Sequence, residues 1–476
     1  MIRMKTVLLL LTIVAGYTTT FAQTVNRLTL RDAIETAITN NIPVQQAGLL
    51  TEREEINWQQ ARANLLPNLN GNFSYGWNQG RNIDPITNSY INQQLASSSL
   101  GINSNVILFA GLQLLNAIKQ THFSHEASKQ EFEQSKNNLT LNVLLTYLLV
   151  LNNEDLLVIS KNQLEVTTQQ VERLDIMVKE GAVGQFQLTD LKGQKSTDEM
   201  SIISNYNALQ SAKLSLCQLL NIPYNKDLVL DRSEFLQPAG LYGQNADEVY
   251  AEALRSFAQV KAGDLRVKSS EKAIKVAKGD YFPVLSFGAN FGSSYSSAAT
   301  SSTPGSIVET QTGDYVKISN QQFDVLRQEQ NFTYSKLGYG NQLNNNRGSF
   351  YGFSLQVPLF NNFRVRNQVK IATIGYKNAE LENANIKRVL RQNIDQAHLN
   401  MTSTFERYKA LQEQLENYEI SFKAAEIRFN NGVINSPEYL LVKNTFDRSK
   451  VNSITAMYEY ILRIKILDFY QAKLLW

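Results

Sequence analysis

The chain consists of two copies of one plan. The motif LLPNL around Pro67 recurs as YFPVL around Pro283, 216 positions later. The motif VILFAGLQ from Val106 recurs as VPLFNNFR from Val357, 251 positions later. Because the offset grows by 35 positions, the second half carries an insertion, which we place in the Ser-, Asn-, Gln- and Gly-rich residues 298–347. That composition predicts a long surface loop.

Each half is predicted to run in the order helix, strand, loop, strand, long helix, turn, helix. We expect a first repeat over residues 23–220, a linker over 221–245 and a second repeat over 246–476. The elements of the first repeat are a helix at 30–64, strands at 69–77 and 98–108, a long helix at 112–178 and a helix at 185–220.

The predicted strands carry no charge. From Leu65 to Gly80 apolar side chains alternate with Asn, Ser and Gly, and no Lys, Arg, Asp or Glu occurs. The segments 98–108, 285–291 and 351–357 repeat this alternation. A half-buried strand of a soluble sheet is the ordinary alternative, but four uncharged copies favour lipid on one face and a narrow aqueous lumen on the other.

Four strands cannot close a barrel. Open sheet edges are not tolerated in lipid, and the smallest single-chain barrels have about eight strands. The chain is therefore expected to oligomerise, and a homotrimer would supply twelve strands.

The long helices set the scale of the fold. A helix over 112–178 would be about 100 Å long at roughly 1.5 Å per residue, which exceeds the thickness of an ordinary domain. The two shorter helices of each half match this length when they are stacked end to end. The most apolar helical run, residues 141–151, is too short to span a bilayer and is predicted to be a helix–helix contact. We predict an α+β, mainly α fold with coiled-coil-like helix packing.

The N-terminus has the features of a secretory signal. Arg3 and Lys5 precede an apolar run over 6–15 and a small-x-small site over 20–22, which predicts a signal peptide at residues 1–22. The run is too short for a membrane span, so a retained anchor helix is the weaker alternative. The chain is therefore expected to be exported.

Composition argues against nucleic-acid binding and catalysis. Charged residues make up 19% of the chain, and without the predicted signal peptide the balance of charge is close to neutral. His122, His125 and Glu126 lie on one helical face and could form part of a metal site, but a further ligand is not implied. Cys217 has no partner for an internal disulfide. We predict no enzyme activity, no metal site and no cofactor.

The chain resembles the TolC-like outer-membrane efflux protein family over essentially all of its predicted mature sequence. The resemblance rests on the duplicated plan, on LFAGLQ at Leu108–Gln113 and LFNNFR at Leu359–Arg364, and on the turns that begin at Gly181 and Gly432. It implies a homotrimeric, 12-stranded outer-membrane β-barrel continued by a long periplasmic α-helical barrel. It also implies an equatorial belt around 222–244 and after Tyr470. The insertion at 298–347 would then be an extracellular loop.

The resemblance also implies where a gate would lie. Family members carry acidic residues that ring the periplasmic entrance, and the matching position six residues after Gly432 is Glu438. Asp190 is the nearest acid in the first half, where Gln187 takes the matching position. The alternative is that both are ordinary solvated residues near a helix N-terminus. Phe429 stands at a gate position where the family has a linking side chain.

Ile434 stands at the second of these gate positions. The tyrosine and arginine links that hold the gate shut in family members are therefore not matched in this chain. The tip turns at Gly181 and Gly432 are candidates for docking a periplasmic adaptor, and Gly432 is predicted to need a left-handed or tight conformation.

The resemblance implies a passive exit channel of a tripartite efflux or type I secretion system. Its partners would be a periplasmic adaptor (membrane fusion) protein, a proton-driven or ABC-type inner-membrane pump and outer-membrane lipid, with no nucleic acid. The location would be the outer membrane of a Gram-negative bacterium, extending into the periplasm. The alternatives are a periplasmic coiled-coil scaffold or adaptor without a pore and, with no catalytic constellation to support it, an exported hydrolase.

Overall fold

The structure is a computed structural model that describes residues 27–83, 88–92, 94–232 and 240–475. The predicted signal peptide at 1–22 lies outside these residues, as do seven residues of the predicted linker. The chain divides into a sheet-containing unit, residues 55–122 and 268–377, and a helical unit formed by the remainder.

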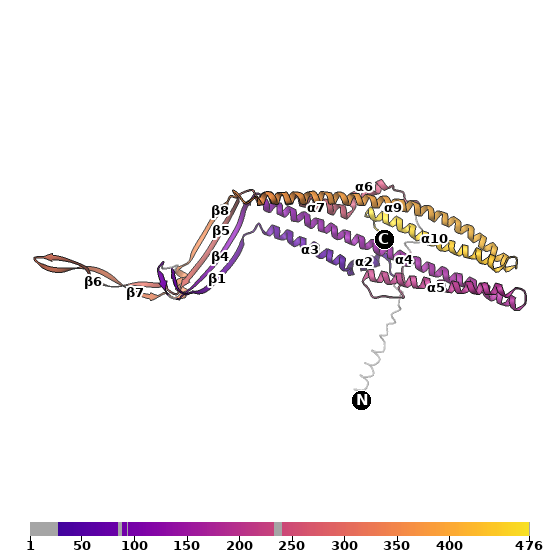
Figure 1. The fold of residues 1–476 in the computed structure, drawn as a ribbon, viewed down its shortest axis with the longest axis horizontal. Helices are drawn as coiled ribbons and strands as arrows, with labels where there is room; N and C mark the ends of the chain where they lie inside the picture. The colour runs from indigo at the N-terminus through magenta and orange to yellow at the C-terminus, as the bar shows by residue number, and fades with distance from the viewer. Residues whose placement is uncertain (1–26, 84–87, 93, 233–239, 476) are drawn as a thin grey trace, which may run out of the picture. The chain divides into compact units, whose positions relative to one another are not determined.

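The sheet-containing unit is built on four antiparallel strands in the order β1-β4-β5-β8 (Figure 1). Each half of the chain contributes two of them, as the duplicated alternation predicts. β1 and β8 are the edge strands of this sheet. The bounds are β1 Asn68–Asn78, β4 Leu95–Ala110, β5 Val284–Ser296 and β8 Gly348–Gln356.

The register separates two chemically different faces. Residues that pair directly on neighbouring strands share one face of the sheet. On the apolar face, Phe73 pairs with Leu100, and Phe287 pairs with Phe353. The other face carries rows of carboxamides and hydroxyls. Asn70 donates to Asn103 across 3.4 Å, and the Ser74 and Ser99 hydroxyls lie 2.8 Å apart.

The insertion is more regular than its composition predicts. It forms a hairpin of β6 Thr300–Ile318 and β7 Gln321–Lys336, followed by the short helix α8 Tyr339–Asn345. Sequence analysis predicted a long surface loop without strands of its own. The strands form because β-branched and aromatic residues between the polar ones favour extended backbone. Nearly every residue of the hairpin is exposed. A second small hairpin pairs β2 Arg81–Ile83 with β3 Tyr90–Asn92.

The helices repeat with the same two offsets as the sequence motifs. α6 and α7 begin and end 216 positions after α2 and α3, and α9 begins and ends 251 positions after α4. α4 and α9 each contain 67 residues. The bounds are α2 Leu30–Asn40, α3 Ile42–Ala63, α4 Gln113–Lys179, α5 Gln185–Leu220, α6 Ala246–Ser256, α7 Ala258–Gly279, α9 Arg364–Asn430 and α10 Ser436–Tyr470.

The single helix predicted at 30–64 is in fact two helices. Asn41 has an extended backbone and ends α2, and its side chain accepts a hydrogen bond of 3.1 Å from the amide of Val44. Pro43, which has no amide hydrogen, is tolerated because it lies in the first turn of α3. Phe257 breaks the second half at the equivalent place, between α6 and α7.

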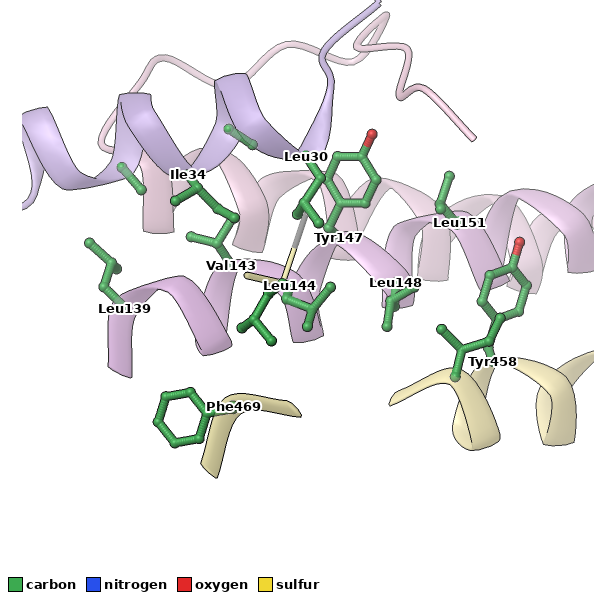
Figure 2. Packing of buried hydrophobic residues seen from close by; sticks show 14 of the residues in the cluster. Leu30, Ile34, Leu139, Val143, Leu144, Tyr147, Leu148, Leu151, Tyr458 and Phe469 are labelled. Carbon is green, nitrogen blue, oxygen red and sulfur yellow. The ribbon is translucent and has the colours of Figure 1, made fainter. Parts of the chain in front are cut away.

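The core of the helical unit surrounds α4 and also draws buried residues from α2, α5, α6, α7, α9 and α10. Figure 2 shows Ile34 of α2 among the side chains of α4, including Val143, Leu144 and Tyr147. These three lie in the apolar run at 141–151, which is confirmed as a helix–helix contact. α4 is the one described helix with a window apolar enough to cross a membrane by length and composition, and half of that window is buried in the protein.

The segment before α2 and the segment after α5 pair with each other and are hydrogen-bonded to α4. Leu28 and Leu230 form a parallel β-bridge. The Tyr147 hydroxyl lies 2.8 Å from the carbonyl oxygen of Leu28 and 2.7 Å from that of Asp231. The part of the predicted linker around Leu230 and Asp231 is therefore held against α4.

Candidate gate at the helical tips

Two helical hairpins carry the sequence-predicted site residues. α4 turns into α5 through Gly181, with φ of 71°, and α9 turns into α10 through Gly432, with φ of 72°. Added Cβ atoms would meet nothing within 4 Å at either glycine. The left-handed backbone, rather than crowding, is what demands glycine at these turns, as predicted for Gly432.

A small apolar cluster, here called the tip core, joins the two hairpins. It is separate from the main core and draws residues from all four helices. Its buried members are Val171, Leu174, Leu188, Leu191, Ala425, Phe429, Ile434 and Tyr439. Phe429 and Ile434, which the resemblance placed at gate positions, are thus packing residues in this chain.

The Phe429 ring lies parallel to that of Tyr439. Their centroids are 4.4 Å apart and their planes differ by 10°. Tyr439 is completely buried, and burial raises the pKa of its hydroxyl above the ordinary value. This hydroxyl has no hydrogen-bond partner among the described residues.

The two candidate gate acids occupy different environments. Asp190 accepts a hydrogen bond of 2.9 Å from the Ser436 hydroxyl, so it connects α5 to the first turn of α10. Glu438 lies in that same first turn, and its amide donates to the Asn435 side chain across 3.0 Å. The Glu438 carboxylate is half exposed and lies 3.9 Å from Arg428. Both residues are exposed, but Asp190 accepts a hydrogen bond from the other hairpin, whereas Glu438 pairs with Arg428 of its own hairpin.

A further contact between the hairpins lies at the C-terminal end of α9. The Arg173 guanidinium donates to both the side-chain oxygen and the carbonyl oxygen of Asn430. A cation is favoured at this position because the last carbonyl groups of a helix concentrate negative charge.

A buried ionic cluster, which we call the Lys443 cluster, lies deeper along the hairpins. Lys443 is 1% exposed, and its ammonium lies 2.7 Å from Asp447 and 3.4 Å from Asp198. Thr167 of α4 donates to Asp198, and Gln194 of α5 donates to it across 2.7 Å. Three helices therefore meet at two carboxylates and one cation.

Burial is the largest influence on Asp447. It raises the pKa of the Asp447 carboxyl above its ordinary value, and nearby Asp198 acts in the same direction while Lys443 opposes it. Sequence analysis missed this cluster. Its only local signal is the spacing of Tyr439, Lys443 and Asp447 four residues apart, which places a lysine and an acid on the same face of α10 as a buried aromatic ring.

The histidine group is not arranged as a metal site. Glu126 pairs with Lys129 across 2.8 Å, and the His122 ring lies 5.0 Å from that of Trp58. Within the described ranges, no group of three or more His, Cys, Asp or Glu side chains could hold a metal ion.

Comparison with known proteins agrees with this architecture. In curated sequences, the chain is 20% identical to "Toxin and drug export protein A" of Aggregatibacter actinomycetemcomitans over 435 residues, covering 91% of this chain and 83% of the relative. Among solved structures, it resembles CusC with a TM-score of 0.73 and 15% identity, covering 93% of this chain and 92% of that one.

The Campylobacter jejuni CmeC outer membrane channel gives a TM-score of 0.71 at 15% identity, over 93% of this chain and 85% of that one. These structural likenesses establish the fold. The family model described as "Outer membrane efflux protein" matches residues 33–221 and 249–463, one segment in each repeat. The chain therefore belongs to the outer membrane efflux protein family, transport proteins that act as exit channels in the outer membrane and extend into the periplasm.

Proposed function

We propose that three copies of the chain close a 12-stranded barrel in the outer membrane and continue it as a periplasmic α-helical tunnel. The observation that carries this proposal is the four-stranded sheet. It is uncharged from edge to edge, and both edge strands, β1 and β8, have an unpaired side within the described chain. Pairing β8 of one subunit with β1 of the next would satisfy both edges and remove them from lipid.

The apolar face of this sheet opposes the main alternative, a scaffold without a pore. Leu69 and Tyr351 are each 75% exposed, and Phe353 is 73% exposed. A soluble scaffold would leave these large side chains in water, whereas the hydrocarbon of a bilayer would cover them. The opposite face, with its Asn, Ser and Gly side chains, would line the lumen.

We further propose that the channel is passive and works with partners. A periplasmic adaptor would dock at the tip turns around Gly181 and Gly432, and a proton-driven or ABC-type inner-membrane pump would supply the energy. The name of the curated relative joins toxin and drug export, which is compatible with either type I secretion or efflux. The half-exposed Glu438, present three times around one axis, would set the charge at the entrance.

The proposal is tested by purifying the detergent-solubilised protein from outer membranes and reconstituting it in planar bilayers. We expect trimers that dissociate on heating and discrete conductance steps. A protein that stays monomeric without detergent and gives no conductance would instead support the scaffold.

A further inference from the structure

The Tyr439 hydroxyl is sealed inside the tip core. Tyr439 is 0% exposed in the single chain, so another subunit could reach its hydroxyl only if the hairpins were rearranged. No described residue hydrogen-bonds to it. A buried hydroxyl without a partner is unfavourable because folding removes its hydrogen bonds to water and returns nothing.

The ring itself is well accommodated. It stacks on Phe429, and the Phe422 ring lies 6.1 Å away with an interplanar angle of 38°. A phenylalanine would keep both contacts, because neither involves the hydroxyl. Packing therefore explains an aromatic residue at 439 but does not explain a tyrosine.

Loss of its proton does not remove the cost of burying the Tyr439 hydroxyl, because the charged form is disfavoured here. Glu426, Asp447 and Asp198 place negative charge around it, which outweighs the opposing effect of Arg173. The group therefore stays neutral and sealed for as long as the two hairpins remain packed together.

The hydroxyl gains a partner only when the hairpins separate and water enters. Tyr439 belongs to the same buried cluster as residues of α4 and α5 from the other hairpin, and it stacks on Phe429 of its own hairpin. We propose that the Tyr439 hydroxyl biases the tip toward opening, by destabilising the packed arrangement relative to a hydrated, separated one. This inference rests on the proposed function, since opening has meaning only if the tip is the entrance of a channel.

The experiment compares Tyr439→Phe with Tyr460→Phe in the full-length trimer. Both tyrosines lie on α10 and are 0% exposed, but the Tyr460 hydroxyl donates to the carbonyl oxygen of Gly240 across 2.9 Å. Amide hydrogen exchange at 436–445 reports separation of the tip, and the open probability in planar bilayers reports opening.

We expect Tyr439→Phe to slow exchange at the tip and to lower the ratio of open to closed channels, each about tenfold, which corresponds to about 1.4 kcal/mol. Tyr460→Phe removes a satisfied hydroxyl far along α10, so it should leave tip exchange unchanged and lower the melting temperature of the trimer.

Unchanged or faster tip exchange in Tyr439→Phe would overturn the inference, and so would slower exchange without a fall in open probability. A wild-type protein that forms no pore is a different result, because it removes the proposed function itself whatever the variant does.

Discussion

At the scale of single residues, the two candidate gate acids differ in whether they connect the two helical hairpins. Asp190 and Glu438 were both predicted as gate acids from the resemblance. Only Asp190 is hydrogen-bonded across the hairpins, through Ser436, while Glu438 remains half exposed. The two acids therefore predict different behaviour when they are neutralised.

Replacing Glu438 with Gln should reduce the cation preference of the channel and weaken block by multivalent cations. A trimer would lose three carboxylates around one axis, where their fields add. Reversal potentials in salt gradients measure the preference. Gln187→Glu, at the equivalent position of the first half, is the reciprocal variant and should increase it. If both variants keep the wild-type ion selectivity, Glu438 is not part of the entrance.

At the scale of elements, the duplicated sequence predicted most of the secondary structure. The offsets of 216 and 251 apply to helix ends as well as to motifs, because boundary residues recur at equivalent places: Pro283 follows Pro67 by 216 positions, and Gly432 follows Gly181 by 251. The break at Asn41 was missed although the sequence marks it, because Pro43 follows Asn41 closely and the apolar face of α2 does not continue into α3. The hairpin of β6 and β7 was missed because its composition resembles that of a loop.

The Lys443 cluster was beyond sequence analysis for a different reason. Lys443 and Asp198 are 245 positions apart, and no local pattern shows that they meet. The register between α5 and α10 depends on the packing of the tip core as a whole. Sequence patterns identify which face of a helix is apolar, but they do not identify which polar side chain on another helix it will meet.

Acidification should stabilise the packed tip. Burial raises the pKa of Asp447, so the packed state holds a proton more tightly than the unfolded state. The stabilisation is fully present below the ordinary value of 3.8 and is lost as pH rises through the pKa of the packed state. Asp447→Asn should remove this dependence and slow amide exchange at the tip at neutral pH.

Asp175→Asn is the matched control. Asp175 pairs with Lys179 across 2.6 Å at the same four-residue spacing, but the pair is exposed and the lysine lowers the pKa of Asp175. Its contribution therefore has the opposite sign and is lost as pH falls. A wild-type tip whose exchange rates, corrected for intrinsic pH effects, are flat with pH would contradict the role given to Asp447.

At the scale of the whole molecule, the four-stranded sheet and the helices have opposite surface chemistry. The four-stranded sheet exposes large apolar side chains and lacks charge, while the helices carry ion pairs such as Arg266 with Glu131, at 2.8 Å. A chain with this division is suited to lipid over one part and to water over the other. Family membership and the sheet register together make the orientation of each face testable.

Phe353→Arg and Ser354→Arg test the two faces with neighbouring residues. Phe353 pairs with Phe287 on the apolar face, and Ser354 pairs with Ser286 on the polar face. Arginine on a lipid-facing position costs roughly 2–4 kcal/mol near the middle of the bilayer. We expect Phe353→Arg to reduce the amount of trimer in outer-membrane fractions and Ser354→Arg to assemble normally. Equal assembly of the two variants would count against the barrel.

The hairpin of β6 and β7 is attached to the sheet mainly at its base. Next to this base, Gln342 of α8 accepts from the amide of Ser296 across 2.9 Å, and Asn346 at the end of α8 donates to the carbonyl oxygen of Ser294 across 2.8 Å. Changes beyond this base leave the pairing of β5 with β8 intact. In the proposed trimer this hairpin lies outside the cell, where it would be free to diversify under attack by antibodies or bacteriophages. We expect a peptide epitope inserted there to leave the wall of the proposed pore intact.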